Sequence, residues 1–320
     1  MVNNGKMISR VQAHYKEVLQ SIKLVDVEER FDLYFSRFLG LYLAKIGEKL
    51  NLTPTHVSLI SLFVGIVGGG LLYFQEDWKL ILVASVLISF AGLLDSADGQ
   101  LARRTGQSTD FGRIIDGVID NCVFFACYFS GCFYFVFGDI GWPILILGAL
   151  AGFGSHSFSS NMYEFYKSEY LYYVGQDKKS KAPSINEIQE KFDQSKGLNR
   201  VIYYLFLDYT KKQIWFSSRN DKVENKFSIH FDNPETKNLF SASYRKHLKI
   251  TLFWWAWIGG TNVHRTMIMV FSLFGRFDLY IYVVLIKFIP FLIMVLYQKR
   301  KDNQFMSAFE SQKDHLELVK

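Results

Sequence analysis

Four aspartates lie at helical spacing on either side of a short polar break between two apolar stretches. Asp95 and Asp98 recur at i and i+3 before the break, and Asp116 and Asp120 recur at i and i+4 after it, so each pair shares one face of a helix. Carboxylates gathered at the ends of apolar helices repel one another unless a cation lies among them. Oxygen-only ligands suit a hard divalent ion, so the pattern predicts a site for Mg²⁺ or Mn²⁺.

Two such ions could neutralise a diphosphate and stabilise a displacement at phosphorus. Gly99 and Gly112 would let a bulky ligand approach the helix backbones closely, and the neighbouring arginines suit an anionic substrate. The break contains Gly106, and three of its residues are suited to cap the second helix: Ser108, Thr109 and Asp110.

The stretch from 95 to 120 resembles the CDP-alcohol phosphotransferase (CDP-alcohol phosphatidyltransferase) signature, D-x-x-D-G-x-x-A-R followed after eight residues by G-x-x-x-D-x-x-x-D. All eight signature positions are matched without a gap. The resemblance implies that Asp95, Asp98 and Asp116 hold the metal ions. It also implies that Asp120 completes the metal site and is the catalytic base. The implied CDP pocket is lined by Gly99, Ala102, Arg103 and Gly112.

The resemblance implies a metal-dependent membrane transferase of phospholipid synthesis. Members of this family move a substituted phosphate group from a CDP-linked donor to an alcohol and release CMP, and a homodimer is expected by the same resemblance. The compact chain resembles bacterial enzymes that use CDP-diacylglycerol as donor. The segment DGQLARRT resembles the corresponding segment of enzymes that use CDP-choline or CDP-ethanolamine with diacylglycerol as acceptor. This activity is the alternative.

The composition favours a membrane protein. The 320 residues are 50% hydrophobic and 17% aromatic, yet 21% are charged, a combination typical of membrane spans joined by charged loops. The net charge is +6, and the basic residues lie between apolar runs. This arrangement fits the positive-inside rule and anionic lipid better than a nucleic-acid partner. The three cysteines lie at five-residue steps in one apolar run, and we interpret them as packing residues.

Six apolar runs approach the length that crosses a ~30 Å hydrocarbon layer. The predicted fold is therefore an all-α integral membrane protein with six transmembrane helices and an amphipathic N-terminal helix at the interface. Three glycines in the first run (68–70) and three in the fourth (Gly148, Gly152 and Gly154) predict close helix contacts. The six runs are 57–74, 80–94, 111–137, 142–163, 248–274 and 279–297.

Charge and apolar runs together divide the chain into five regions. They are a cytoplasmic N-terminal segment (1–52), spans one to four with the motif (53–163), a basic insert (164–247), spans five and six (248–298) and a tail (299–320). The loops after runs one and three lack Lys and Arg, whereas the break between runs two and three is basic. The aspartates and both termini are therefore predicted to face the cytoplasm, and a bacterial cytoplasmic membrane is favoured.

The insert could lie on the membrane or form a soluble mini-domain unrelated to catalysis. Ser184 and Glu187 have the spacing of a capping box, which predicts a short helix that stops near Gly197. The pair Asn233-Pro234 predicts the start of the helix that leads into span five.

Ionisable residues within the last two apolar runs are costly in lipid unless they face a polar cavity. In family members with phosphorylated acceptors, basic side chains of the later spans bind the phosphate, so Arg265, His264 and Lys287 are candidates to hold inositol phosphate or glycerol phosphate. The neighbouring Gly259-Gly260 pair is expected to act as a local hinge. His156 is expected to be a satisfied interior histidine.

A divalent-metal or lipid transporter is the alternative that requires no catalysis. Transport would favour carboxylates or broken helices near the bilayer midplane and internal repeats. The aspartates instead lie at the ends of apolar runs, beside two arginines, and the sequence shows no repeat. The pattern therefore favours the enzyme.

Overall fold

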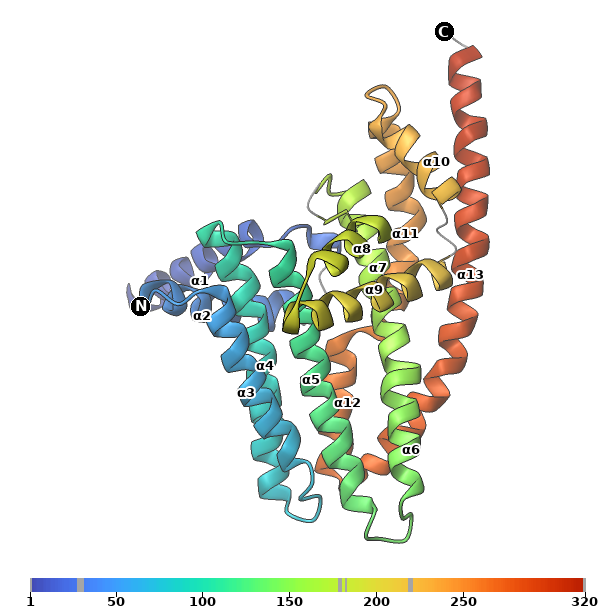
Figure 1. Cartoon of the computed structure of the whole chain (residues 1–320). Helices are drawn as coiled ribbons and strands as arrows, with labels where there is room; N and C mark the ends of the chain where they lie inside the picture. The colour runs from blue at the N-terminus through green and yellow to red at the C-terminus, as the bar shows by residue number, and fades with distance from the viewer. Residues whose placement is uncertain (1, 28–31, 178–179, 182, 218–220, 319–320) are drawn as a thin grey trace. The chain divides into compact units, whose positions relative to one another are not determined.

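The computed structural model is built from helices, and no strand occurs in the residues it describes (Figure 1). The chain forms two compact units, Met1–Gly152 with Arg265–Tyr282, and Phe153–His264 with Val283–Lys320. The described residues are 2–27, 32–177, 180–181, 183–217 and 221–318.

The first unit contains the aspartate motif on two long helices, α4 and α5. Its N-terminal part also includes a 3-10 turn at Val25–Val27 and a π-helical turn at Asp32–Ser36. Most of α12 (Thr261–Leu273) and the start of α13 belong to this unit as well. The other helices are α1 (Val2–Ser21), α2 (Arg37–Lys49), α3 (Pro54–Leu71), α4 (Trp78–Thr105), α5 (Asp110–Phe135) and α6 (Pro143–Ala149).

Glycines let α3 pack closely against both α4 and α5. An added Cβ at Gly68 would lie 3.0 Å from Leu87 of α4, and one at Gly69 would lie 3.0 Å from Ala126 of α5. The predicted close contacts are thus confirmed at these two positions. Gly70 has nothing within 4 Å of its Cβ direction and takes no part in the packing.

Caps fix where the motif helices begin. Thr53 caps α3 by accepting a hydrogen bond from the N–H of His56, and Pro54 is the first helical residue. Of the three candidate caps for α5, Thr109 has this role, because its hydroxyl accepts a hydrogen bond of 3.0 Å from the N–H of Gly112. Gly106 ends α4 with a φ of 70°, a left-handed conformation that favours glycine.

The amphipathic pattern near the N-terminus forms α2, which packs against α4. Its inner face is made of small residues and one leucine, while Tyr42 and Ile46 are exposed. Small residues shorten the distance between the two helices, since an added Cβ at Gly40 would lie 3.0 Å from the hydroxyl oxygen of Ser96. The amphipathic helix is therefore present, and its position at a membrane interface stays a prediction. The buried residues of α2 are Gly40, Leu41, Ala44 and Gly47.

The second unit contains the insert, which is helical. Ser184 caps α8 by accepting from the N–H of Glu187, and α8 stops near Gly197 as expected. The prediction that Asn233-Pro234 starts a helix is three residues too early, because Asn233 forms a turn by accepting from the N–H of Glu235. The helices are α7 (Ser157–Tyr173), α8 (Ile185–Gln194), α9 (Gly197–Ser217), α10 (Asp221–Asp232), α11 (Lys237–Gly259) and α13 (Phe277–Leu318).

An aromatic core joins α7, α10, α11 and α13 of the second unit. Beside it, His247 Nε2 of α11 lies 2.7 Å from Asp302 Oδ1 of α13, and both side chains are buried. This pair fixes the register between the two long helices. The rings of the core belong to Tyr173, Phe227, Phe231, Phe240, Tyr244, Phe305 and Phe309.

Among the residues that the structure describes, four helices are long and apolar enough to cross a membrane, which indicates an integral membrane protein. They correspond to predicted runs one, two, three and six: Pro54–Leu71, Trp78–Thr105, Phe111–Phe135 and Phe277–Ser311.

The other two predicted runs are interrupted. Run four is divided among α6, a π-helical segment (Leu150–His156) and α7. Run five is divided between α11 and α12 at Gly260, whose ψ of 132° is extended. The count of six spans therefore remains a prediction.

Candidate active site

Three of the four motif aspartates come together where α4 and α5 carry the signature. α4 continues beyond the apolar run and stays helical through Thr105, so Asp95 and Asp98 lie on one continuous helix, as their spacing predicts. The carboxylates of Asp95, Asp98 and Asp116 are close enough to repel one another. Asp98 is the most enclosed of them, with 3% of its surface exposed.

A serine from α3 completes this cluster. Ser58 is 3% exposed, and its hydroxyl donates a hydrogen bond of 2.6 Å to Asp98 Oδ2. The hydroxyl oxygen of Ser58 also lies 3.3 Å from Asp116 Oδ1 and 3.1 Å from the carbonyl oxygen of Pro54. Ser58 thus joins carboxylates of α4 and α5 and holds them against α3.

Sequence reasoning missed Ser58. The only signal was a hydroxyl residue in an apolar run, and Ser61, three residues later, gives the same signal. Ser61 instead donates to the carbonyl oxygen of Ala91 at 2.8 Å.

The chemistry of the cluster fits a hard divalent cation. Three carboxylates and one hydroxyl present only oxygen donors, which Mg²⁺ and Mn²⁺ prefer. In the part of the chain that the structure describes, no group of three or more His, Cys, Asp or Glu side chains is arranged as the ligands of a single ion. The residues therefore fit the ion by donor type and charge and do not form a closed ligand cage.

The fourth motif aspartate, Asp120, contacts an arginine. It lies one turn after Asp116 on α5, and its Oδ1 is 3.8 Å from Nη2 of Arg265 on α12. The side chain of Arg265 is 13% exposed and that of Asp120 is 29% exposed. The predicted base and the predicted acceptor-binding arginine are therefore neighbours within the first unit.

The predicted CDP-binding residues lie at the polar ends of the two motif helices. Gly99, Ala102 and Arg103 are on the last turns of α4 and are partly exposed. Arg103 Nε donates to the carbonyl oxygen of Ser21 at 2.8 Å, so this arginine also holds the end of α1. Gly112 is on the first turn of α5, where its N–H serves the Thr109 cap.

The other two predicted acceptor residues lie in the second unit. Lys287 Nζ is 3.4 Å from His264 Nε2 and 3.4 Å from the carbonyl oxygen of Trp257. His156 is buried as expected, and its ring stacks on that of His264 with centroids 3.7 Å apart. His264 and Lys287 are thus brought together with His156, whereas Arg265 is placed with Asp120.

The two glycines before α12 have different roles. An added Cβ at Gly259 would meet the backbone of α7, at 2.8 Å from the amide nitrogen of Ser160 and closer still to the carbonyl of Ser159. Gly259 is therefore a packing residue and not part of a hinge. Gly260 is where the helix breaks.

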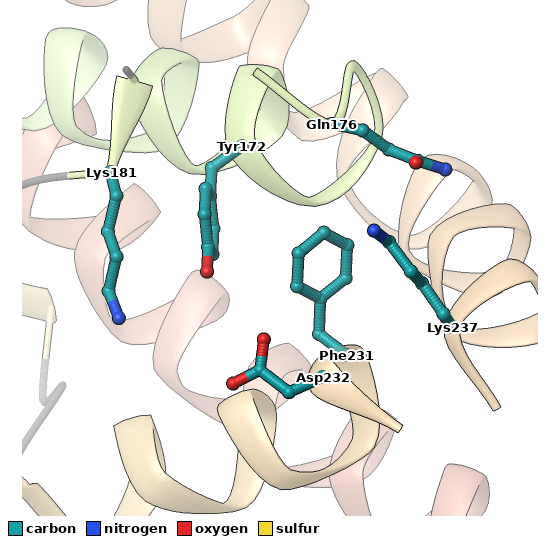
Figure 2. Close-up of a pocket in the computed structure, with 6 residues that line it drawn as sticks. All are labelled: Tyr172, Gln176, Lys181, Phe231, Asp232 and Lys237. Atoms are coloured by element: carbon teal, nitrogen blue, oxygen red, sulfur yellow. The ribbon is translucent and has the colours of Figure 1, made fainter. Parts of the chain in front are cut away.

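A separate hollow of about 340 Å³ lies in the second unit (Figure 2). Two lysines lie over aromatic rings at its wall, Lys181 over Tyr172 at 5.7 Å and Lys237 over Phe231 at 4.8 Å. None of the sequence-predicted site residues lines it. The lining residues are Tyr172, Gln176, Lys181, Phe231, Asp232 and Lys237.

Comparison with known proteins gives a family for the segment that contains the motif. Residues 51–182 match the family model described as CDP-alcohol phosphatidyltransferase. An uncharacterized protein of Aquifex aeolicus (strain VF5) is 35% identical over 72 residues, which cover 22% of this chain and 35% of that protein. The archaetidylinositol phosphate synthase of Pyrococcus horikoshii is 30% identical over 81 residues, which cover 24% of this chain and 41% of the synthase.

The matched parts amount to less than half of either relative's length. The family match nevertheless contains all eight signature positions, from Asp95 to Asp120, together with Ser58. Residues 51–182 are therefore similar to the CDP-alcohol phosphatidyltransferase family, which is a family of phosphotransferases.

Proposed function

We propose that this protein is a metal-dependent membrane transferase that moves a phosphatidyl group from CDP-diacylglycerol to a polar alcohol and releases CMP. The observation that carries the proposal is that Ser58 joins Asp98 to Asp116, with the charge of Asp95 acting on both carboxylates, within the segment that matches the family. Burying three carboxylates in a largely apolar setting is costly unless a cation neutralises them, and a cation together with a diphosphate would complete the site.

The reaction requires one new bond and one broken bond at phosphorus. The acceptor's hydroxyl oxygen attacks the phosphorus that carries diacylglycerol, and the bond from this phosphorus to the CMP oxygen breaks. Divalent ions held by Asp95, Asp98 and Asp116 would neutralise the diphosphate. Gly99, Ala102, Arg103 and Gly112, at the polar ends of α4 and α5, would bind the CDP part.

Asp120 is the proposed base. It completes the proposed metal site and accepts the proton that the acceptor's hydroxyl loses as its oxygen bonds to phosphorus. Its place one turn after Asp116 puts it beside the proposed metal ligands, and its Oδ1 lies 3.8 Å from the guanidinium of Arg265.

We further propose that the acceptor is a phosphorylated polyol such as inositol phosphate or glycerol phosphate. Arg265 is suited to bidentate contact with a phosphate, and an acceptor bound there would bring its hydroxyl groups near Asp120. The name of the Pyrococcus relative gives a product that contains inositol phosphate. Lys287 and His264 are the secondary candidates, because the ammonium of Lys287 contacts an imidazole and a carbonyl oxygen.

The proposed setting is a bilayer with the aspartates and both termini on the cytoplasmic side, where CDP-linked compounds and phosphorylated polyols occur. A homodimer and a bacterial cytoplasmic membrane belong to the same proposal. The basic break between α4 and α5, with Arg103, Arg104 and Arg113, supports this orientation.

An assay of purified protein for CMP release tests the function. CDP-diacylglycerol is supplied with myo-inositol 1-phosphate, glycerol 3-phosphate, myo-inositol or serine, with Mg²⁺, with Mn²⁺ or with excess chelator. We expect release that depends on the metal and is fastest with a phosphorylated polyol. Turnover only with diacylglycerol and CDP-choline or CDP-ethanolamine would assign the alternative activity. Absence of CMP release from every donor, together with metal uptake into vesicles, would favour the transporter.

A further inference from the structure

Arg265 lies against the backbone of α4 at a glycine. An added Cβ at Gly92 would be 2.6 Å from Cζ of Arg265 and 3.3 Å from its Nε, and it would overlap Nη1. All three of the nearest atoms belong to this one guanidinium group. The space that Gly92 leaves is therefore filled by the charged end of Arg265.

Three glycines of α3 in the same unit have different neighbours. At Gly68 and Gly69 the nearest atoms include backbone of the facing helix, and at Gly65 they all belong to Val123. Those glycines bring one helix close to another through apolar or backbone contacts. Gly92 instead admits a side chain that also contacts the carboxylate of Asp120.

We propose that Gly92 is a specificity-determining position. The space left by its missing side chain, which we call the seat, holds the guanidinium of Arg265 where it can reach Asp120 and an anionic acceptor. Gly92 of α4 supplies the room, and Asp120 of α5 supplies the attraction. The distance of 3.8 Å to Asp120 is longer than a hydrogen bond, so charge holds the guanidinium there. The part of this proposal that concerns the acceptor rests on the proposed function.

The seat makes Arg265 a cation whose position is fixed before the acceptor arrives. A side chain with four rotatable bonds loses entropy when it is ordered, and a site that has already ordered it binds its ligand more tightly. An anionic acceptor gains from this arrangement, whereas a neutral alcohol does not. Gly92 is thus a positioning residue that acts through Arg265.

Gly92→Ala is the informative substitution. The atoms in the way of the new methyl group are at the far end of a flexible side chain, so the guanidinium moves and the helices keep their places. Gly70→Ala on α3 is the matched control, because it makes the same gain in helix propensity with nothing within 4 Å of the new methyl group.

The first readout is the KM of each substrate. We expect Gly92→Ala to raise the KM for myo-inositol 1-phosphate or glycerol 3-phosphate by about tenfold, the size of one charge-assisted contact, and to leave the KM for CDP-diacylglycerol within about twofold. The KM for unphosphorylated myo-inositol should not change. In the Arg265→Ala background, Gly92→Ala should have no further effect. Gly70→Ala should behave as the unsubstituted protein.

The second readout needs no substrate. Thermal unfolding midpoints are measured for the unsubstituted protein, both single variants and the double variant. We expect Gly92→Ala to lower the midpoint in the presence of Arg265 and not after Arg265→Ala, because truncation removes the clash.

The outcomes separate the two proposals. If Arg265→Ala raises the KM of the acceptor and Gly92→Ala does not, the proposed role of Gly92 as the seat is overturned, and the proposed function is unaffected. An unchanged acceptor KM in Arg265→Ala overturns the assignment of the acceptor, and with it the role of Gly92 in specificity. If the shifts of the unfolding midpoint in Gly92→Ala and Arg265→Ala simply add in the double variant, the two residues do not interact, and the seat is overturned whatever the acceptor is.

Discussion

Ser58→Ala is expected to weaken the metal site by a predictable amount. A hydroxyl has one hydrogen to donate, and the 2.6 Å distance to Asp98 Oδ2 identifies the main acceptor among its three neighbours. Hydrogen bonds to charged groups contribute about 1.5–3 kcal/mol. With Ser58 and Asp98 each 3% exposed, bulk water has little access to replace the lost donor.

The same magnitude follows from the role of groups that orient metal ligands. Removing such a partner lowers metal affinity by about 10–100-fold, which corresponds to about 1.4–2.7 kcal/mol. The two ranges overlap, so we expect the Mg²⁺ or Mn²⁺ concentration for half-maximal CMP release to rise by about 10–100-fold in Ser58→Ala. The rate at saturating metal should recover most of its original value, because no proposed ligand is lost.

The assay is a metal titration of CMP release at saturating donor, and Ser61→Ala is the matched control. Ser61 lies one turn away on α3, is also 3% exposed and donates to the carbonyl oxygen of Ala91. Both variants lose a buried hydrogen bond, and only Ser58→Ala should change the metal requirement. Equal metal requirements in the two variants, or an unchanged requirement in Ser58→Ala, would refute the role of Ser58.

Three further predictions concern other parts of the chain. Asp116→Ala should abolish CMP release and metal-dependent protection against thermal unfolding, and release that survives this change or excess chelator would contradict the metal assignment. Asp120→Asn should bind the CDP donor and lose about 10²–10⁴-fold in turnover, since the proton has no acceptor, and a near-native rate would show that another group is the base. Gly259→Ala should destabilise the protein by about 1–3 kcal/mol, because its methyl group would meet the backbone of Ser159 and Ser160, whereas Gly154→Ala meets nothing within 4 Å. Equal unfolding midpoints for these two glycine variants would disprove the packing role of Gly259.

The local features of the site could be predicted from the sequence. The spacing of the aspartates requires only helical periodicity, and the structure continues α4 through Asp98 and starts α5 after Thr109. Caps such as Thr109 and Ser184 were recognisable because a cap depends on residues within three positions of it.

The features that depend on distant parts of the chain could not be predicted. Ser58 and Ser61 look alike in the sequence, and only the rotation of α3 against α4 and α5 decides which one meets Asp98. The contact of Arg265 with Gly92 joins positions 173 residues apart. Hydrophobicity also gave no sign of the π-helical segment within run four, because backbone hydrogen-bond registry leaves no pattern in composition.

The length of α13 limits how the second unit can meet a bilayer. Its 42 residues rise by 1.5 Å each, which gives about 63 Å, or twice a ~30 Å hydrocarbon layer. If the layer begins near Phe277, it ends near Tyr297, and the later turns stand in the headgroups or in water. Asp302, Phe305 and Phe309 lie on those turns, where they hold α10 and α11. The helix therefore fixes the distance between its membrane-spanning part and the aromatic core. We expect the protein to adapt to a thicker bilayer by changing the tilt of α13, and not by moving the aromatic core along the membrane normal.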